Sequence, residues 1–289
     1  MFNCFKYKRF MIPRSLSERE INMIIDFHTH IFPDKIAKSA LNSLSKRAQL
    51  SPFYDGTLGG LLISMKKSAI DLSVALPIAT RADQTVSINN FALSVNQMQS
   101  RVISFGTMHP DFEGYKEEMD RLKENHIIGI KMHPVYQNFY VDDETVLPIY
   151  EYAAKIGLVL VVHGGIDIGY PGVLKCTPLR CRRVVDRIKG LKFVVAHMGG
   201  YECWDEVEEY LIGQKVYIDT SFSSQKLDPI RMTKMIQKHG ADKMLFATDA
   251  PWAGQKEEVK KINAMPLSEE EKELIFHKNA ENLLGLNLK

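Results

Sequence analysis

The stretch IIDFHTH, residues 24–30, is an apolar run that ends in two histidines one residue apart. Side chains at positions i and i+2 of a strand point to the same side, roughly 6.5–7 Å apart. The rings of His28 and His30 are therefore expected to share one side and to converge on a single ion. Asp26 has the same parity, so we expect it one layer deeper, where its carboxylate would support the two rings.

Further runs along the chain have the same β-branched, apolar character. With the first run, taken as residues 23–30, they are residues 72–79, 101–109, 127–133, 158–163, 192–197, 215–220 and 243–249. Segments with helical spacing separate them, and this alternation is typical of parallel βαβ units. Hydrophobicity is continuous within each run, which indicates burial on both faces of the sheet.

These units predict an α/β fold, a (β/α)8 TIM barrel that forms one domain over residues 23–289. A doubly wound open sheet is the alternative. It normally has a Gly-rich turn after the first strand, whereas this chain has HTHIFP at that place.

The bulk composition is that of an ordinary globular protein. The chain has 289 residues, of which 45% are hydrophobic and 25% charged, with a formal net charge of +2. This balance predicts neither a nucleic-acid partner nor a membrane partner, and the apolar runs are shorter than the ~18–20 residues of a membrane span. The four cysteines are irregularly spaced, which indicates reduced thiols and a cytoplasmic protein.

The first 22 residues show neither helical nor strand periodicity and no apolar signal-peptide core. Arg19 and Glu20 could be encoded by a sequence that resembles a ribosome-binding site just before Met23. We therefore expect translation to start at Met23, with residues 1–22 a mis-called or disordered leader.

Chemically active side chains end most of the predicted strands. In a barrel these positions meet at one mouth, where active sites are built. The residues concerned are His28, His30, His109, His133, His163, His197 and Asp249. Burying imidazoles and a carboxylate together without partners would cost several kcal/mol for each group, so the pattern predicts a bound cation.

Four motifs, DFHTH, VVHGG, VVAHMGG and FATDAPW, resemble the amidohydrolase superfamily in their order and spacing. More narrowly, residues 23–289 resemble the amidohydrolase-related branch that contains aminocarboxymuconate-semialdehyde decarboxylase and γ-resorcylate decarboxylase. GIKMHP (129–134), YIDTS (217–221) and the terminal NAENLLGL belong to the same resemblance. The resemblance implies one divalent metal per chain, most often Zn²⁺, held by His28, His30, His163 and Asp249. It also implies that His197 is an acid/base beside the metal, and that Asp249 takes a proton during catalysis.

Substrate contacts are expected near the same mouth. Lys131 lies near the position at which binuclear members of the superfamily carry a carbamylated lysine. It could bridge two metals, bind a substrate carboxylate, or pair with a core acid, and His133 faces the same way. Arg81 and Arg180 are candidate carboxylate clamps, because a guanidinium binds a carboxylate in a fork. Trp252 is one of several aromatic residues past the strand ends that could stack on a planar substrate, cover loops or form a homodimer contact.

Together these features predict an enzyme that acts on a small molecule. The leading prediction is a metal-dependent hydrolase, in which a metal-activated water attacks an amide, a lactone or a related carbonyl compound. The alternative is a non-oxidative decarboxylase that uses the same metal site. A metal-stabilised protein without catalysis is disfavoured, because structural zinc sites are closed and rich in cysteine.

Overall fold

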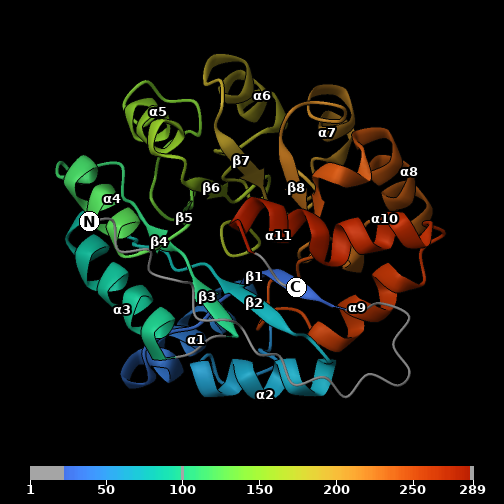
Figure 1. The fold of residues 1–289 in the computed structure, drawn as a ribbon, viewed down its shortest axis with the longest axis horizontal. Coiled ribbons are helices and arrows are strands. Elements are labelled where there is room, and N and C mark those ends of the chain that lie inside the picture. Colours follow the sequence, from blue (N-terminus) through green and yellow to red (C-terminus); the bar gives the residue numbers. More distant parts are fainter. Residues whose placement is uncertain (1–22, 99–100, 287–289) are drawn as a thin grey trace, which may run out of the picture.

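The computed structural model describes residues 23–98 and 101–286. The expectation of a leader at residues 1–22 lies outside the described residues. Figure 1 shows the strands gathered at the centre of the molecule, with the helices arranged around them.

The strands pair in parallel, in the order of the sequence, as two hydrogen-bonded sheets, β1-β2-β3 and β4 to β9. Their bounds are β1 (Ile25–Thr29), β2 (Leu72–Ala75), β3 (Val102–Ser104), β4 (Gly106–Thr107), β5 (Gly129–Met132), β6 (Val159–Val162), β7 (Lys192–Val195), β8 (Tyr217–Asp219) and β9 (Met244–Leu245). β3 and β4 are two parts of one predicted run, separated only by Phe105. The Phe105 N–H donates to the Ala75 carbonyl at 2.9 Å.

Hydrogen bonds also join the first strand to the last. The Phe27 N–H donates to the Phe246 carbonyl (2.9 Å), and the Asp249 N–H donates to the His28 carbonyl (2.8 Å). Each of the predicted runs contains a strand, and the ends of the series are connected. The predicted single-domain (β/α)8 barrel is confirmed.

A bulge in β1 changes which side chains face the barrel interior. Between Asp26 and Thr29 the register against β2 shifts by one residue, and the unpaired His28 N–H donates instead to Asp26 Oδ1 (3.3 Å). A bulge of this kind reverses the inward and outward alternation along the strand. The prediction that Asp26 supports the two rings from beneath is therefore wrong. Its carboxylate accepts hydrogen bonds from the Thr248 hydroxyl (2.6 Å) and the Gln255 amide (2.8 Å).

The helices are α1 (Asp34–Ala48), α2 (Leu58–Ser68), α3 (Thr85–Met98), α4 (Tyr115–Glu124), α5 (Leu147–Ile156), α6 (Pro178–Arg187), α7 (Trp204–Tyr210), α8 (Pro229–His239), α9 (Gln255–Asn263), α10 (Glu269–Glu273) and α11 (Asn279–Leu284). Their ends follow local signals. Thr57 caps α2 by accepting from the Gly60 N–H (2.9 Å), and Gly157, at a φ of 75°, ends α5. Within the described ranges, none of the helices combines the length and the apolar character needed to cross a membrane.

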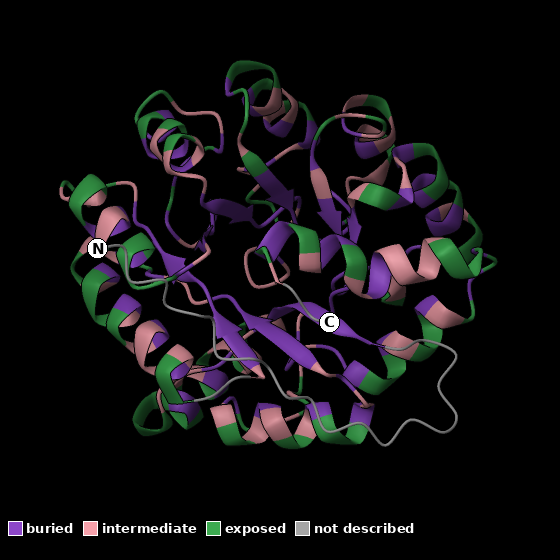
Figure 2. Ribbon diagram, viewed as in Figure 1, coloured by how far each residue is buried: buried purple, intermediate pink, exposed green. Residues whose placement is uncertain are grey.

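The core has two parts. The barrel interior is filled by side chains such as Phe27, Phe105 and Val161, and Leu283 of α11 covers it at the end where the strands begin. The second part lies between the outer faces of the strands and the surrounding helices. Figure 2 shows the strands buried over most of their length, apart from Lys192 and Tyr217 at the starts of β7 and β8, and the helices exposed on their outer faces. Because α11 covers one end of the barrel, the opposite end, where the strands finish, is left for a site.

Candidate metal centre

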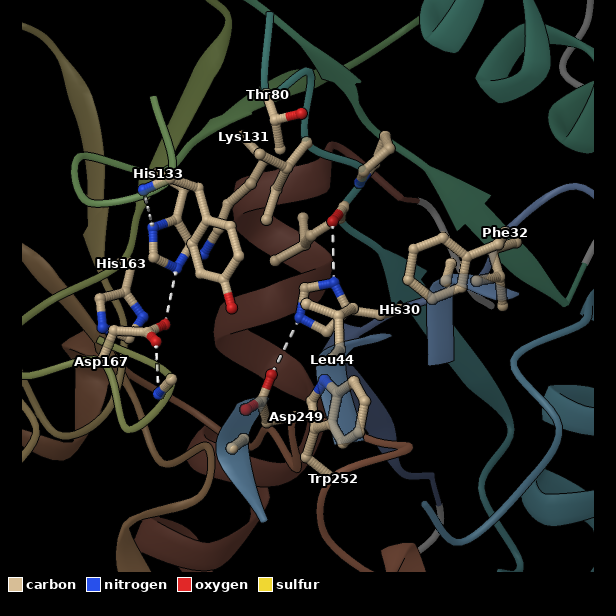
Figure 3. A pocket seen from close by; sticks show the side chains of 18 of the residues that line it. His30, Phe32, Leu44, Thr80, Lys131, His133, His163, Asp167, Asp249 and Trp252 are labelled. Atoms are coloured by element: carbon tan, nitrogen blue, oxygen red, sulfur yellow. Dashed lines mark hydrogen bonds and ion pairs between the residues drawn. The ribbon is translucent and has the colours of Figure 1, made fainter. Parts of the chain in front are cut away.

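A cavity of about 560 Å³ lies where the strands end (Figure 3). Eight of the residues predicted for the site line it: His28, His30, Lys131, His133, His163, His197, Asp249 and Trp252. His109 is buried but does not line the cavity, and its Nδ1 accepts from the Asp111 N–H (3.1 Å). The barrel thus brings together side chains that lie more than 200 positions apart in the sequence.

His28, His30 and Asp249 form the tightest group. Their potential ligand atoms lie within 4.8 Å of one another. Asp249 Oδ1 is 2.9 Å from His30 Nε2 and 3.4 Å from His28 Nε2. The carboxylate therefore sits between the Nε2 atoms of the two rings.

Contacts on the far side of each ring determine its tautomer. His28 Nδ1 lies 2.9 Å from Asp219 Oδ2, and His30 Nδ1 lies 3.0 Å from the Leu76 carbonyl oxygen. Both partners can only accept, so each Nδ1 carries the proton. The Nε2 atom of each ring then faces Asp249 as the potential ligand atom. This is the arrangement that outer hydrogen bonds impose on metal-binding histidines.

The charge state of this group favours a cation. Burial, and then the nearby Lys131 ammonium, holds the pKa of His28 well below its usual value, so this ring is neutral. Burial alone would raise the pKa of Asp249, but the contact with His30 and the neighbouring imidazoles bring it below its usual value. A carboxylate and imidazole lone pairs repel one another unless positive charge lies between them. The donor set of this group fits a divalent ion such as Zn²⁺ or Mn²⁺.

His197 and Asp249 both have left-handed backbones, at φ values of 63° and 68°. Such a conformation costs about 1–3 kcal/mol for a residue other than glycine. Hydrogen bonds oppose this cost, because the His197 N–H donates to Asp219 Oδ1 (2.9 Å) and the Asp249 N–H to the His28 carbonyl (2.8 Å). Both side chains are thereby turned into the cavity from the loops that follow β7 and β9.

His163 and His197 extend the group. His197 Nδ1 lies 3.1 Å from the Ser221 carbonyl and so carries the proton, which leaves a lone pair on Nε2. That Nε2 is 2.9 Å from His163 Nδ1. Burial, and then His133, holds the pKa of His163 well below its usual value. Of the four predicted metal ligands, His163 therefore stands apart from the other three, because its ring contacts His197 rather than Asp249.

A second group of His133, His163 and Asp167 also has ligand atoms within 4.8 Å of one another. His133 Nδ1 accepts from the Tyr136 N–H (3.4 Å), so its Nε2 carries the proton and faces Asp167 Oδ2 at 3.3 Å. In this second group His133 donates to the Asp167 carboxylate. In the first group, by contrast, the Nε2 atoms of two imidazoles face the Asp249 carboxylate. The His163 ring stacks on His133 at 4.3 Å, and its buried Nε2 has no hydrogen-bond partner among the described residues.

Lys131 of β5 is almost fully buried at the floor of the cavity. Its Nζ has no hydrogen-bond partner within the part of the chain that the structure describes. Burial lowers the pKa of Lys131 to about 8, while Asp219 and Asp249 oppose that shift. The ammonium form therefore predominates at neutral pH. Among the described residues no core acid accepts a hydrogen bond from Lys131, although Asp219 and Asp249 favour its charged form.

The two arginines lie elsewhere. The Arg81 side chain is 65% exposed, pairs with Asp83 at 3.0 Å, and does not line the cavity. Arg180 forms an ion pair with Asp142 and stacks on Tyr140 at 4.2 Å, also away from the cavity. The prediction of carboxylate clamps at these positions is wrong, because each guanidinium already has an acidic partner on the surface side of its loop or helix.

Asp219 and Asp167 are the site residues that sequence reasoning missed. Asp219 ends the strand β8 and holds the ring of His28, and Asp167 follows β6 and holds the ring of His133. The criterion that selected Asp249, an acid at the end of a strand run, would have selected Asp219 as well. Asp167 carries no such signal, because it lies in a loop.

The family model described as amidohydrolase matches residues 25–286. No curated protein matches the sequence. Among solved structures, a TIM-barrel protein from Bordetella bronchiseptica has a TM-score of 0.71 and 19% identity, covering 91% of this chain and 99% of its own.

Two further solved structures are decarboxylases. The 5-carboxyvanillate decarboxylase of Sphingomonas paucimobilis has a TM-score of 0.68 and 16% identity, covering 91% of this chain and 99% of its own. The dihydroxybenzoic acid decarboxylase of Polaromonas sp. JS666, solved with manganese and 2-nitroresorcinol, has a TM-score of 0.70 and 16% identity, covering 92% and 98%. At this identity the likeness establishes the fold.

The leading prediction of a hydrolase is contradicted by this comparison. The two structures described above whose names give an activity are both decarboxylases. The motifs that suggested hydrolysis describe how a metal is held, and the two reactions can share that feature.

Proposed function

Because this chain belongs to the amidohydrolase family, whose model spans residues 25–286, we propose that it is a metal-dependent, non-oxidative decarboxylase of a small carboxylic acid. One observation carries the proposal. The unpaired ammonium of Lys131 lines the same cavity as His28, His30 and Asp249. A carboxylate held there would lie beside a candidate metal centre, which is what this reaction requires.

In this proposal His28, His30, His163 and Asp249 hold one divalent metal. Imidazole nitrogen and carboxylate oxygen suit both Zn²⁺, which the resemblance implies, and Mn²⁺, which the Polaromonas decarboxylase binds. When bound, the ion supplies Lewis-acid polarisation of a substrate oxygen. Asp219 and the Leu76 carbonyl keep the lone pairs of the two β1 histidines directed at that position.

Lys131 is the proposed partner of the substrate carboxylate. Among the described residues that line the cavity, it is the one lysine or arginine. A buried ammonium without a partner is costly, so a bound carboxylate would compensate its lost hydration. The pair would also orient the bond that breaks.

The reaction needs a proton at the carbon that loses CO2. The bond between that carbon and the carboxyl group breaks, and its electron pair stays on the carbon, which takes up a proton. His197 and Asp249 are the candidate carriers. His197 has its Nδ1–H held by the Ser221 carbonyl, and its Nε2, 2.9 Å from His163 Nδ1, would be the atom that exchanges a proton once His163 binds the metal.

The test is CO2 release by the full chain loaded with Mn²⁺ or Zn²⁺, on a panel of aromatic carboxylates that includes 2,6-dihydroxybenzoate and its derivatives with an alkyl chain or a second ring. With a substrate from that panel, Lys131→Met should lower kcat/KM by about a hundredfold or more, because a buried ion-pair partner contributes several kcal/mol. Metal content should stay unchanged. Thermal stability should hold or rise, since a buried unpaired ammonium is replaced by an apolar chain of similar length.

Arg81→Met is the matched control, because it removes a cation that is already neutralised on the surface. We expect its kcat/KM to stay within twofold of the wild type. The absence of CO2 from every carboxylate in the panel, or full activity in Lys131→Met, would refute the proposal.

A further inference from the structure

The cavity is polar at its floor and apolar along its walls. Of its charged lining residues, Lys131 lies on β5, and Asp167 and Asp249 lie in the loops after β6 and β9. Figure 3 shows Phe32 across the cavity from His163 and Asp167. Further from the floor, the walls that the structure describes carry only apolar and uncharged polar side chains. The walls therefore have no ion with which to recognise a second charged group.

One wall is a strip on α1. Ile36, Ala40, Leu44 and Ala48 recur every fourth residue and all line the cavity. The neighbouring face of the same helix, with Ala37 and Leu41, is the one buried against the body of the protein. The strip is thus not needed to attach the helix. Ile36 remains 50% exposed, so its side chain would gain from cover by a ligand.

The opposite walls have the same character. Ile88 and Phe91 of α3 contribute on one side, and Ile166 and Ile168 in the loop after β6 contribute on the other. Arg47 of α1 does not enter the cavity. Its guanidinium lies over the Tyr170 ring at 4.6 Å, which ties α1 to the loop after β6. These apolar walls and the α1 strip form what we call the apolar groove.

The size of the cavity exceeds what one ring requires. A cavity of about 150 Å³ is enough to hold benzene, whereas this one has a volume of about 560 Å³. An acid with a single ring at the floor would leave most of the apolar groove in contact with water. Pockets of this size usually enclose ligands that bury most of their surface.

We propose that the substrate is amphipathic, with one carboxylate at the Lys131 end and an uncharged apolar body, an alkyl chain or a second ring, along the α1 strip. This inference rests on the proposed decarboxylase function, because that function places the carboxylate at Lys131. It adds the chemical class of the remainder of the molecule. Substrates that carry a second charged group on that remainder are disfavoured by the uncharged walls.

The test is binding of benzoate, 4-butylbenzoate and 4-hexylbenzoate to the full, Mn²⁺-loaded chain, measured by titration calorimetry. Affinity should rise about two- to fourfold for each methylene, as for a chain that enters an apolar site. Leu44→Asp should abolish most of this rise and leave benzoate binding nearly unchanged. Asn42→Asp, the same charge on the exposed face of α1, is the matched control and should keep the full rise.

Three results would overturn the inference: affinity that does not change with chain length, equal weakening of all three ligands by Leu44→Asp, or loss of the rise in Asn42→Asp. Leu44 is half-buried, so circular dichroism and the melting temperature should confirm that its variant folds. The measurement does not require turnover. Chain-length dependence without CO2 from any acid would refute the decarboxylase alone, and CO2 release without chain-length dependence would refute the apolar groove alone.

Discussion

Replacing Asp219 by asparagine should change the tautomer of a proposed metal ligand while changing the shape of the site very little. Asp219 Oδ1 accepts from the backbone N–H groups of His197 (2.9 Å) and Ser221 (3.1 Å), and Oδ2 accepts from His28 Nδ1 (2.9 Å). In Asp219→Asn the amide oxygen must take the Oδ1 place, because two backbone donors point at it. The amide NH2 then faces His28 Nδ1.

That contact changes the tautomer of His28. Two donors cannot face each other, so the proton moves from Nδ1 to Nε2, and the lone pair that pointed at Asp249 is lost. The new Nε2–H would instead donate to Asp249 Oδ1, which is 3.4 Å away. It would therefore compete with the metal for Asp249, a second proposed ligand. Loss of such an outer partner typically lowers metal affinity 10- to 100-fold, or about 1.4–2.7 kcal/mol. We expect Asp219→Asn at the upper end of this range, because two ligands are affected.

The assay is titration of the metal-free chain with Mn²⁺ or Zn²⁺ in competition with a chelator. Asp26→Asn is the control, because Asp26 is an equally buried carboxylate on the strand that carries His28 but does not touch its ring. Burial raises the pKa of Asp26 to about 7, so an amide resembles its protonated form. The buried Gln255 Oε1, which has no hydrogen-bond partner in the described structure, can accept from the new amide if Gln255 turns over.

Asp26→Asn should keep metal affinity within about threefold of the wild type, well short of the drop expected from an outer partner of a ligand. Wild-type metal affinity in Asp219→Asn would refute the argument from tautomers. An equal loss in both variants would show that any buried carboxylate near β1 matters, and would refute it as well.

Three shorter predictions follow from the same geometry. His197→Ala should retain metal yet lose most activity, and loss of metal there would make His197 a ligand. Asp249→Asn should abolish turnover even if some metal remains bound, and unchanged turnover would remove Asp249 from the reaction. His239 donates from Nε2 to the Val216 carbonyl, and burial lowers its pKa from 6.5 to about 4. The native state therefore binds fewer protons than the unfolded chain between these values, and stability should fall by roughly 3 kcal/mol as pH drops from 6.5 to 4. His239→Gln should remove most of that fall in urea unfolding experiments, and an unchanged pH dependence would exclude His239 as its source.

The sequence indicates candidate metal ligands, but it does not indicate which reaction they support. HxH after the first strand, single histidines after later ones and an aspartate after the last describe how a cation is held. They do not distinguish hydrolysis from decarboxylation, because both reactions can use one ion and the same carriers of protons. The feature that favours decarboxylation is the unpaired Lys131. Its lack of a partner depends on which side chains surround it.

The sequence by itself determined the barrel and the position of the site. Parallel strands in sequence order must bring their carboxyl ends to one mouth, so a histidine or aspartate that ends a strand can be placed from its position in the chain alone. Tertiary structure decided which atoms face each other there. The tautomer of His28 depends on Asp219, which is 191 positions away, and the outward turn of Asp26 depends on a one-residue shift of β1 against β2. Such contacts join segments that no local periodicity relates, because they are set by how strands and loops pack once the barrel has closed.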